Sequence, residues 1–435
     1  MKIAKRLVAL VLCLACVLPL AACGAKDPVP EVVEQRDYSE FAGIVEDPKT
    51  WYENFMQLPI ANENMTEQEL RQLVVDTFKA NLTFTWTPTS TITYDFDIYH
   101  VELPKGIAYS GLCYAIRVPD ATCGTIWKIL PYYDLETGAL DVDAMGKHLL
   151  NFMSSACSYG PIQAWDRVSN SHGLTGMNSY NIYESNIVPV GPYRYKRQDY
   201  GYNFETTTAT AEIYEKAGRD VMAESLAQMK PADGMYSSPS WHVMMCAEPP
   251  VVVRNADGSI HPFDSYIIVH EQGYTGTGYD TLNHPQGNGI AMRPLGFVSR
   301  KYTFNQLLNS KYIPFTIKEL IGQDPVEPGQ VWLGNNSRFE NGAALTLAQI
   351  GSEYLCANYA ICTMLIEVKT PEGQVLVSYV PQADTNPTRM RESMRGLLDE
   401  SRLSPYADGK NTIHISARLS NGELLEAFHT VLKIN

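Results

Sequence analysis

Hydrophobic positions recur along the chain with two different periods, which separate helical from strand-rich regions. Over residues 66–81 the apolar positions fall on one helical face, directly after a capping-box motif formed by Thr66 and Glu69. Strand-like alternation of Thr, Ile, Tyr and Phe follows at residues 84–101. Helical spacing returns later in the first half of the chain, at residues 143–153, 161–168 and 206–229.

From residue 241 onward the pattern becomes that of β strands. Apolar runs at residues 241–246 and 251–253 precede a turn that contains Asp257 and Gly258, and a third run follows at residues 265–271. Because Asp-Gly favours tight turns between antiparallel strands, these runs predict a meander. The pattern then predicts a short helix at residues 302–308 and a strand at residues 312–317.

Residues 325–329 contain two prolines and a glycine, which interrupt both periods and mark a domain boundary. The segments that follow have the pattern of short strands, at residues 364–368, 375–380, 412–419 and 427–432. We therefore expect an α+β protein. Its body would occupy residues 51–322, and a small all-β sandwich of the immunoglobulin-like type would occupy residues 325–435.

The start of the chain has the pattern of an export signal. Three cations lie within the first six residues, and the apolar run at residues 7–20 is too short to span a bilayer comfortably. The run ends in Leu-Ala-Ala-Cys, which resembles the lipobox of bacterial lipoproteins. The resemblance implies a signal peptide at residues 1–22, lipidation of Cys23 and an acylated tether at residues 23–50. An ordinary small-residue cleavage site is the alternative.

Composition and charge narrow the class of partner. The formal net charge is −14, with 34 Lys and Arg against 48 Asp and Glu, and no long basic cluster interrupts this acidic excess. Since binding to phosphate depends on clustered cations, nucleic acid is excluded as an expected partner. Charged residues make up only 19% of the chain while Tyr alone numbers 26, which favours a surface that handles polar, uncharged material.

Nine cysteines are present, and one has a context that suits chemistry. Six lie in the body of the chain: Cys113, Cys123, Cys157, Cys246, Cys356 and Cys362. Their spacing matches no zinc motif, so we expect no metal or cofactor. Cys113 with Cys123, or Cys356 with Cys362, would be able to form disulfides in an exported protein, and buried free thiols are the open alternative. Cys157 stands apart because it precedes a predicted helix, whose amino-terminal end favours the reactive thiolate.

A nucleophilic thiol needs a base, and the base needs a residue that orients it. His242 is the preferred base among nine histidines because it opens a predicted strand directly after Trp241. Glu271 ends the next strand and is the preferred third residue, which would fix the imidazole tautomer. Gln272 and His270 remain open as alternatives to Glu271.

The order of these motifs resembles the papain-like cell-wall cysteine peptidases of the NlpC and CHAP type. The resemblance rests on three short motifs, at residues 156–165, 241–244 and 269–272. It implies a papain-like fold in which an antiparallel sheet packs on helices, with Cys157, His242 and Glu271 as the catalytic residues. A glycine-flanked loop at residues 106–111 is similar to a loop that NlpC-type enzymes place beside the active site.

The resemblance also implies contacts with substrate, at Tyr109, Trp165 and Trp241. The chain departs from the family pattern at Ala156, where many NlpC-type enzymes have Asp, and in the length of the segment between Cys157 and His242. The usual dipeptide specificity is therefore not implied.

The function expected from the resemblance is that of a cysteine peptidase or amidase exported and anchored by lipid to the cell membrane, facing the cell wall. It would hydrolyse amide bonds of peptidoglycan stem peptides or of muropeptides through a thioester intermediate. The alternative is a non-catalytic surface lipoprotein that binds wall polymer or an envelope protein. A solute-binding lipoprotein is a third possibility, but it leaves the order of Cys, His and Glu unexplained.

Overall fold

The structure is a computed structural model, and it describes residues 46–96, 99–114, 125–169, 187–193, 209–273, 296–334, 343–381 and 391–433. The predicted signal peptide, Cys23 and almost the whole predicted tether lie outside these residues, as does Cys123. Within the described ranges, every helix is too short or too polar to cross a bilayer.

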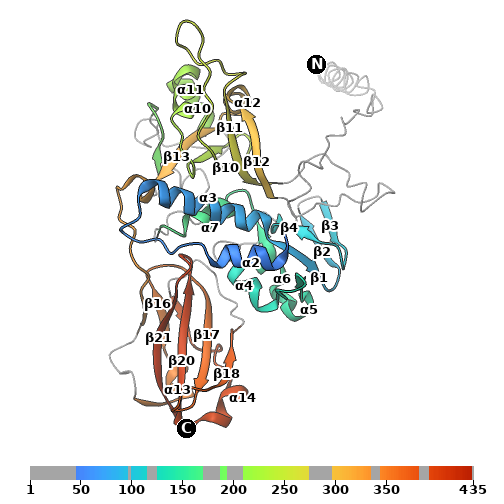
Figure 1. Cartoon of the computed structure of the whole chain (residues 1–435), viewed down its shortest axis with the longest axis vertical. Coiled ribbons are helices and arrows are strands. Elements are labelled where there is room, and N and C mark those ends of the chain that lie inside the picture. The colour runs from blue at the N-terminus through green and yellow to red at the C-terminus, as the bar shows by residue number, and fades with distance from the viewer. Residues whose placement is uncertain are drawn as a thin grey trace, which may run out of the picture. The chain divides into compact units, whose positions relative to one another are not determined.

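The chain is an α+β protein with several antiparallel sheets. Its longer helices are α2 (Pro48–Met56), α3 (Glu67–Thr83), α7 (Tyr159–Trp165), α10 (Ala209–Ala217), α11 (Arg219–Ala227) and α12 (Phe304–Asn309). The predicted capping box is confirmed, since Thr66 and Glu69 bond each other's backbone at the start of α3. Helices α3 and α7 lie side by side (Figure 1).

A six-stranded antiparallel sheet packs against these two helices, with strand order β12-β11-β10-β9-β13-β8. Its strands are β8 (Ile187–Pro189), β9 (Gly234–Ser237), β10 (His242–Cys246), β11 (Tyr266–Gln272), β12 (Gly296–Thr303) and β13 (Ile313–Ile317). The predicted meander is confirmed for its two longer runs, because β10 and β11 pair antiparallel with Met245 opposite His270, but residues 251–253 form only a single bridge from Val251 to Tyr266 and no strand. One hydrophobic cluster joins this sheet to α3 and α7.

A second hydrophobic cluster combines Trp51 and Phe55 of α2 with smaller elements that follow α3. They are β1 (Thr85–Pro88), β2 (Ile92–Phe96), β3 (Tyr99–Leu103), β4 (Tyr109–Ser110), β5 (Cys113–Tyr114), α4 (Thr125–Ile129), β6 (Ala139–Leu140), α5 (Val142–Met145), α6 (Leu149–Met153) and β7 (Ser154–Ser155). Cys157 belongs to this second cluster, whereas most of α7 belongs to the first. Tyr159 packs against both clusters, so the start of α7 lies where the two cores meet.

The last part of the chain forms a third hydrophobic cluster between two sheets. A three-stranded sheet contains β14 (Val331–Leu333), β16 (Tyr354–Ala357) and β19 (Arg391–Ser393), and a five-stranded sheet contains β15 (Ala344–Thr346), β17 (Ile361–Lys369), β18 (Val375–Tyr379), β20 (Asp408–Leu419) and β21 (Leu424–Lys433). All four predicted strands are confirmed. The pairing of β15 with β21 is parallel, whereas the other strand pairs of these two sheets are antiparallel.

Three local predictions need correction. Glycines with positive φ explain the first two, and charged residues within a strand explain the third. The helix expected at residues 143–153 is broken after α5, where Gly146 has φ +51. The helix expected at 206–229 is two helices, because Gly218 has φ +87 and separates α10 from α11. Residues 296–303 form β12, a strand that the apolar pattern did not predict because charged residues interrupt it.

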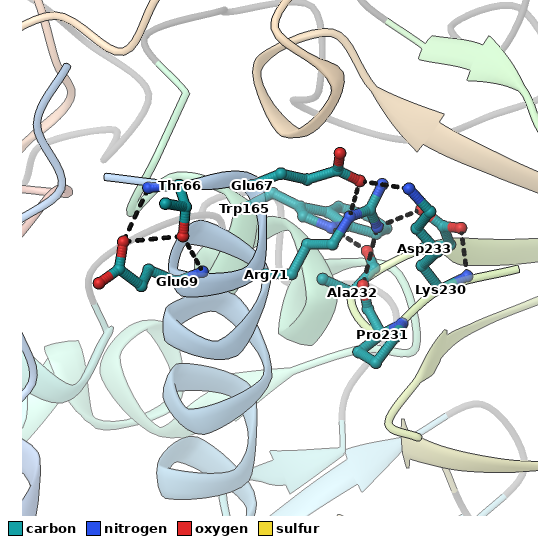
Figure 2. A network of polar contacts seen from close by, with 9 residues as sticks. All are labelled: Thr66, Glu67, Glu69, Arg71, Trp165, Lys230, Pro231, Ala232 and Asp233. Carbon is teal, nitrogen blue, oxygen red and sulfur yellow. Dashed lines mark hydrogen bonds and ion pairs between the residues drawn. The ribbon is translucent and has the colours of Figure 1, made fainter. Parts of the chain in front are cut away.

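A buried ion pair holds α3 against the loop that leads into β9 (Figure 2). The Arg71 guanidinium donates to Asp233 at 2.7 Å and to the Pro231 carbonyl at 2.8 Å. Both charged side chains are almost completely buried. In the same place the Trp165 indole N–H of α7 donates to the Ala232 carbonyl at 2.9 Å. The network therefore ties α3 and α7 to the strand that pairs with β10, and this fixes the helix and the strand that carry the candidate site.

Candidate active site

Cys157 lies in the turn that leads into α7. The Gly160 N–H donates to the Ala156 carbonyl at 3.1 Å, so residues 156–160, which include Cys157, form a backbone turn. The residue is buried, with 8% of its surface exposed. Its Sγ lies 3.5 Å from the Trp241 carbonyl oxygen, which brings the thiol to the first residue of the His242 motif.

His242 is the first residue of β10 and faces the thiol. The two side chains interact, because His242 acts to lower the pKa of Cys157 and Cys157 acts to raise the pKa of His242. Its Nε2 lies 2.6 Å from Glu271 Oε2. Because Nε2 is engaged by the carboxylate, Nδ1 is the ring nitrogen that remains for the thiol. Trp241, just before it, has φ +48, a conformation that is rare for a bulky residue and that often marks a functional site.

Glu271 lies on the same face of the sheet as His242 because of strand register. Cys246 pairs with Val269, and side chains two apart on a strand share a face, so both functional side chains point the same way. The carboxylate is 2% exposed. Arg300 donates to its Oε1 at 2.7 Å and the Tyr302 hydroxyl donates at 2.8 Å. Both carboxylate oxygens of Glu271 therefore take part in hydrogen bonds.

The alternatives for the third residue point to the other face. The Gln272 amide donates to the Leu112 carbonyl at 2.8 Å and is buried. His270 accepts the Ser299 N–H on Nδ1 at 3.1 Å, and burial lowers its pKa to about 4. The structure thus brings Glu271, and neither of its neighbours, to His242.

The electrostatics of the three residues favour an ion pair between thiolate and imidazolium. Burial opposes the charged thiolate, but the hydrogen bond and charge of His242 outweigh it and hold the pKa of Cys157 below its ordinary value. Burial likewise opposes the imidazolium, yet the bonds to Cys157 and Glu271 raise the pKa of His242 to about 10. Glu271 stays ionised, since His242 and Arg300 lower its pKa against the effect of burial.

Other buried cysteines show that burial alone has the opposite effect. Burial raises the pKa of Cys113 to about 12, and it raises the pKa of Cys246 further. Cys113, Cys246 and Cys362 are buried thiols, so the disulfide considered between Cys356 and Cys362 is not formed, while Cys123, the partner considered for Cys113, lies outside the described residues. The reactive form is therefore favoured at Cys157 by its partner His242.

Tyr114 is a site residue that the sequence pattern did not identify. Its side chain forms a hydrogen bond with Cys157 that lowers the thiol pKa. The residue ends β5, which pairs in parallel with β7 immediately before Cys157, with Tyr114 opposite Ser155. The two segments are far apart in sequence, so only this pairing reveals the contact. Arg300 and Tyr302 were missed for the same reason, because they act through β12.

Two of the three predicted substrate contacts are in the core. Tyr109 is 4% exposed and its ring lies 5.1 Å from that of Trp86. Trp165 is completely buried and its ring packs 5.6 Å from that of Phe315. Neither position meets the expectation of substrate contact, because aromatic side chains on the buried face of an element pack internally. Trp241 differs, since it is 56% exposed beside His242.

The geometry supplies an activated nucleophile, a base and a residue that orients the base. This is the arrangement required for acyl transfer to a thiol. The described residues near the thiol are a histidine, a carboxylate and a tyrosine. The arrangement can attack a carbonyl carbon, protonate a leaving amine and later activate water.

Comparisons with known proteins provide no family for the chain. No family model matches it, and no curated protein matches it. Among solved structures, the crystal structure of CopC from Methylosinus trichosporium OB3b matches at 13% sequence identity and a TM-score of 0.16. The match covers 24% of this chain and 94% of that protein. At this TM-score the likeness supports no inference about fold or function.

Proposed function

We propose that the protein is a cysteine peptidase or amidase that hydrolyses amide bonds of peptidoglycan stem peptides. The observation that carries the proposal is that His242 interacts with the Cys157 thiol and also bonds the buried Glu271 carboxylate at 2.6 Å. The proposal includes a papain-like catalytic body and an all-β sandwich after it. The wall substrate rests on the motif resemblance to NlpC and CHAP-type enzymes and on the predicted lipid anchor at Cys23.

The proposed reaction begins when the Cys157 thiolate attacks the amide carbonyl carbon. Backbone N–H groups at the turn into α7 stabilise the oxyanion, and the C–N bond breaks as the His242 imidazolium gives its proton to the leaving amine. The product is a thioester on Cys157. His242, now neutral, takes a proton from water, which attacks the thioester and releases the carboxylic acid and the thiolate. Glu271 holds the imidazole in one orientation throughout.

Trp241 is the proposed substrate contact. It is exposed, it adjoins His242, and its carbonyl faces the thiol. An aromatic side chain in this position offers a surface on which a sugar ring or the aliphatic part of a stem peptide can pack.

The test is hydrolysis of purified muropeptides, followed by mass spectrometry of the products. Cys157→Ala and His242→Ala should each abolish product formation. Cys356→Ala is the matched control, because Cys356 is buried to the same 8% exposure and lies on β16, in the part of the chain that follows the proposed catalytic body. Hydrolysis that continues unchanged in Cys157→Ala would refute the proposal.

A thiol probe separates this proposal from the non-catalytic alternative. A surface lipoprotein without activity would have a Cys157 that is buried or misaligned with His242. The thiol is buried, with 8% exposed, whereas the interaction of the two side chains speaks against misalignment. We expect iodoacetamide to label Cys157 before the other cysteines at pH 7, and His242→Ala to suppress that preference. Equal labelling of Cys157 in both proteins would favour the non-catalytic alternative.

A further inference from the structure

A cluster of two histidines and a glutamate lies far along the chain from Cys157, on the outer face of the five-stranded sheet. His414 of β20 and His429 of β21 are directly opposite each other in the antiparallel pair. Neighbouring positions on β20, such as Ile413 and Ile415, are completely buried in the third hydrophobic cluster. Since side chains alternate between faces, the two histidines point away from this core.

A β-bulge brings the glutamate to the same face. Ile415 pairs with Phe428, but the next residue, Ser416, pairs with Glu426, so β21 has one extra residue at this point. Without the bulge, Glu426 and Phe428 would share the core-facing side. Because the register shifts, Glu426 is exposed while Phe428 stays buried. Bulges commonly re-aim a side chain in this way at functional positions.

The three side chains converge on one point. His414 Nδ1 lies 2.7 Å from Glu426 Oε2, and His429 Nδ1 lies 2.8 Å from Glu426 Oε1. The two imidazole rings are stacked, with centroids 5.4 Å apart and planes at 20°. The available ligand atoms all lie within 4.8 Å of one another, the only such group of three or more among the described residues.

Two further features prepare the group to accept a cation. His414 Nε2 lies 3.0 Å from the Thr412 hydroxyl, which orients the ring and leaves Nδ1 directed at the cluster. A partner on the second ring nitrogen is the usual device that orients a metal-binding histidine. Glu426 presents one carboxylate oxygen to each histidine, which holds both rings toward the same point.

We propose that His414, Glu426 and His429 form a binding site for a late first-row divalent ion, Zn²⁺ or Cu²⁺. Two imidazole nitrogens and one carboxylate oxygen suit these ions better than Mg²⁺ or Ca²⁺, which prefer oxygen ligands throughout. Each imidazole binds the ion through Nδ1 as the tautomer that carries its proton on Nε2, so a proton held between Nδ1 and the carboxylate moves to Nε2 or to solvent. Water completes the coordination from the solvent side, and the bound ion links β20 to β21.

The sequence did not point to this site because its ligands are not spaced as a metal motif. His414 lies on one strand, and the other two ligands lie on the next. Only the hairpin pairing and the bulge bring them together. The site is independent of the proposed hydrolase activity.

The experiment is calorimetric titration of the untagged full chain in detergent, after dialysis against EDTA, with ZnCl₂ and CuCl₂ in separate runs. All proteins carry Cys157→Ala, which removes the thiol at the candidate active site as a competing ligand. We expect one strong site per chain. His414→Gln and His429→Gln should each weaken binding by about tenfold or more, since loss of even a supporting residue costs about 10–100-fold.

Two controls test the assigned ligands. His261→Gln removes a partly exposed histidine that lies 3.2 Å from Asp264 in the body of the chain, and it should leave binding unchanged. Glu367→Gln removes a carboxylate opposite His414 on β17, which pairs with Lys369 at 2.9 Å, and it should have a smaller effect than Glu426→Gln. An equal loss in Glu367→Gln and Glu426→Gln would overturn the assigned ligand set.

Thermal unfolding guards against variants that fail to fold. A bound ion should raise the melting temperature of the parent protein and leave that of His414→Gln unchanged, provided that the two start from the same value within a few degrees. If the ion binds the parent and His429→Gln equally, or binds neither, the site is refuted. Zn²⁺ and Cu²⁺ are distinguished by their relative affinities in the parent protein.

Discussion

Replacing Glu271 by Gln tests whether the buried carboxylate sets the protonation state of the candidate nucleophile. In the native protein all three partners of Glu271 donate to it: His242 at 2.6 Å, Arg300 at 2.7 Å and Tyr302 at 2.8 Å. Glutamine has the same shape but only one acceptor oxygen. Its NH₂ group must therefore face a donor on one side, and the negative charge that stabilises the imidazolium is lost.

The magnitude follows from the kind of contact that is removed. A hydrogen bond to a charged group contributes about 1.5–3 kcal/mol. Because one pKa unit corresponds to about 1.36 kcal/mol, the pKa of His242 should fall from about 10 by about one to two units. The sign is fixed by the charge: without the carboxylate the protonated ring is less stable, so it holds its proton less strongly. The thiolate loses its counter-charge in turn, and the pKa of Cys157 should rise.

The assay is the rate of alkylation of Cys157 by iodoacetamide as a function of pH, resolved by peptide mass spectrometry. In the native protein the rate should reach half its plateau below pH 9, the ordinary value for a thiol, because the thiolate is stabilised. In Glu271→Gln this midpoint should rise by about one unit or more. Glu224→Gln is the matched control, since Glu224 pairs with Arg254 at 2.6 Å on the exposed surface. Superimposable profiles for folded Glu271→Gln and native protein would refute the reasoning.

Three further changes probe the site and the scaffold that supports it. Tyr114→Phe removes a hydrogen bond to the thiolate, so the midpoint pH for alkylation of Cys157 should rise by about one pH unit. An unchanged midpoint would show that Tyr114 does not act on the thiol. Arg71→Ala leaves the Asp233 carboxylate buried without its cation. The unfolding free energy measured by urea denaturation should therefore fall by about 3–5 kcal/mol. A fall of less than about 1 kcal/mol would show that the ion pair does not stabilise the fold. Gly234→Ala puts a Cβ 2.2 Å from a ring carbon of Phe315, so the unfolding free energy should fall by about 1–3 kcal/mol, and native stability would show that the ring can move.

Local signals explain which elements were predictable. Helix α3 is specified by a capping box and a helical apolar stripe, and both act within the segment itself. Strand β12 lacks such a signal, because Arg300 and Lys301 interrupt its apolar positions. Arg300 is explained only by the ion pair with Glu271 on the neighbouring strand. A charged residue with a buried partner looks like a surface residue until the pairing is known.

The third residue of the candidate site illustrates the limit of strand periodicity. His270, Glu271 and Gln272 are consecutive, so they alternate between the two faces of β11. Which of them meets His242 depends on the register between β10 and β11, and a shift of one residue would reverse the answer. The sequence was therefore able to name the short stretch and to prefer Glu271 within it, but only the strand register decides between Glu271 and its two neighbours.

Glu426 is a second residue whose face on the sheet depends on strand register. Counting in twos from the buried Phe428 places Glu426 on the core side of β21, where an ionised carboxylate would be very unfavourable. The bulge between these residues reverses the face of Glu426 and delivers it to His414 and His429. A carboxylate at an apparently apolar position is thus a signal that the regular ladder is broken there. The β-bulge therefore makes simple strand alternation assign Glu426 to the wrong face, and it also brings together the ligands of the proposed metal site.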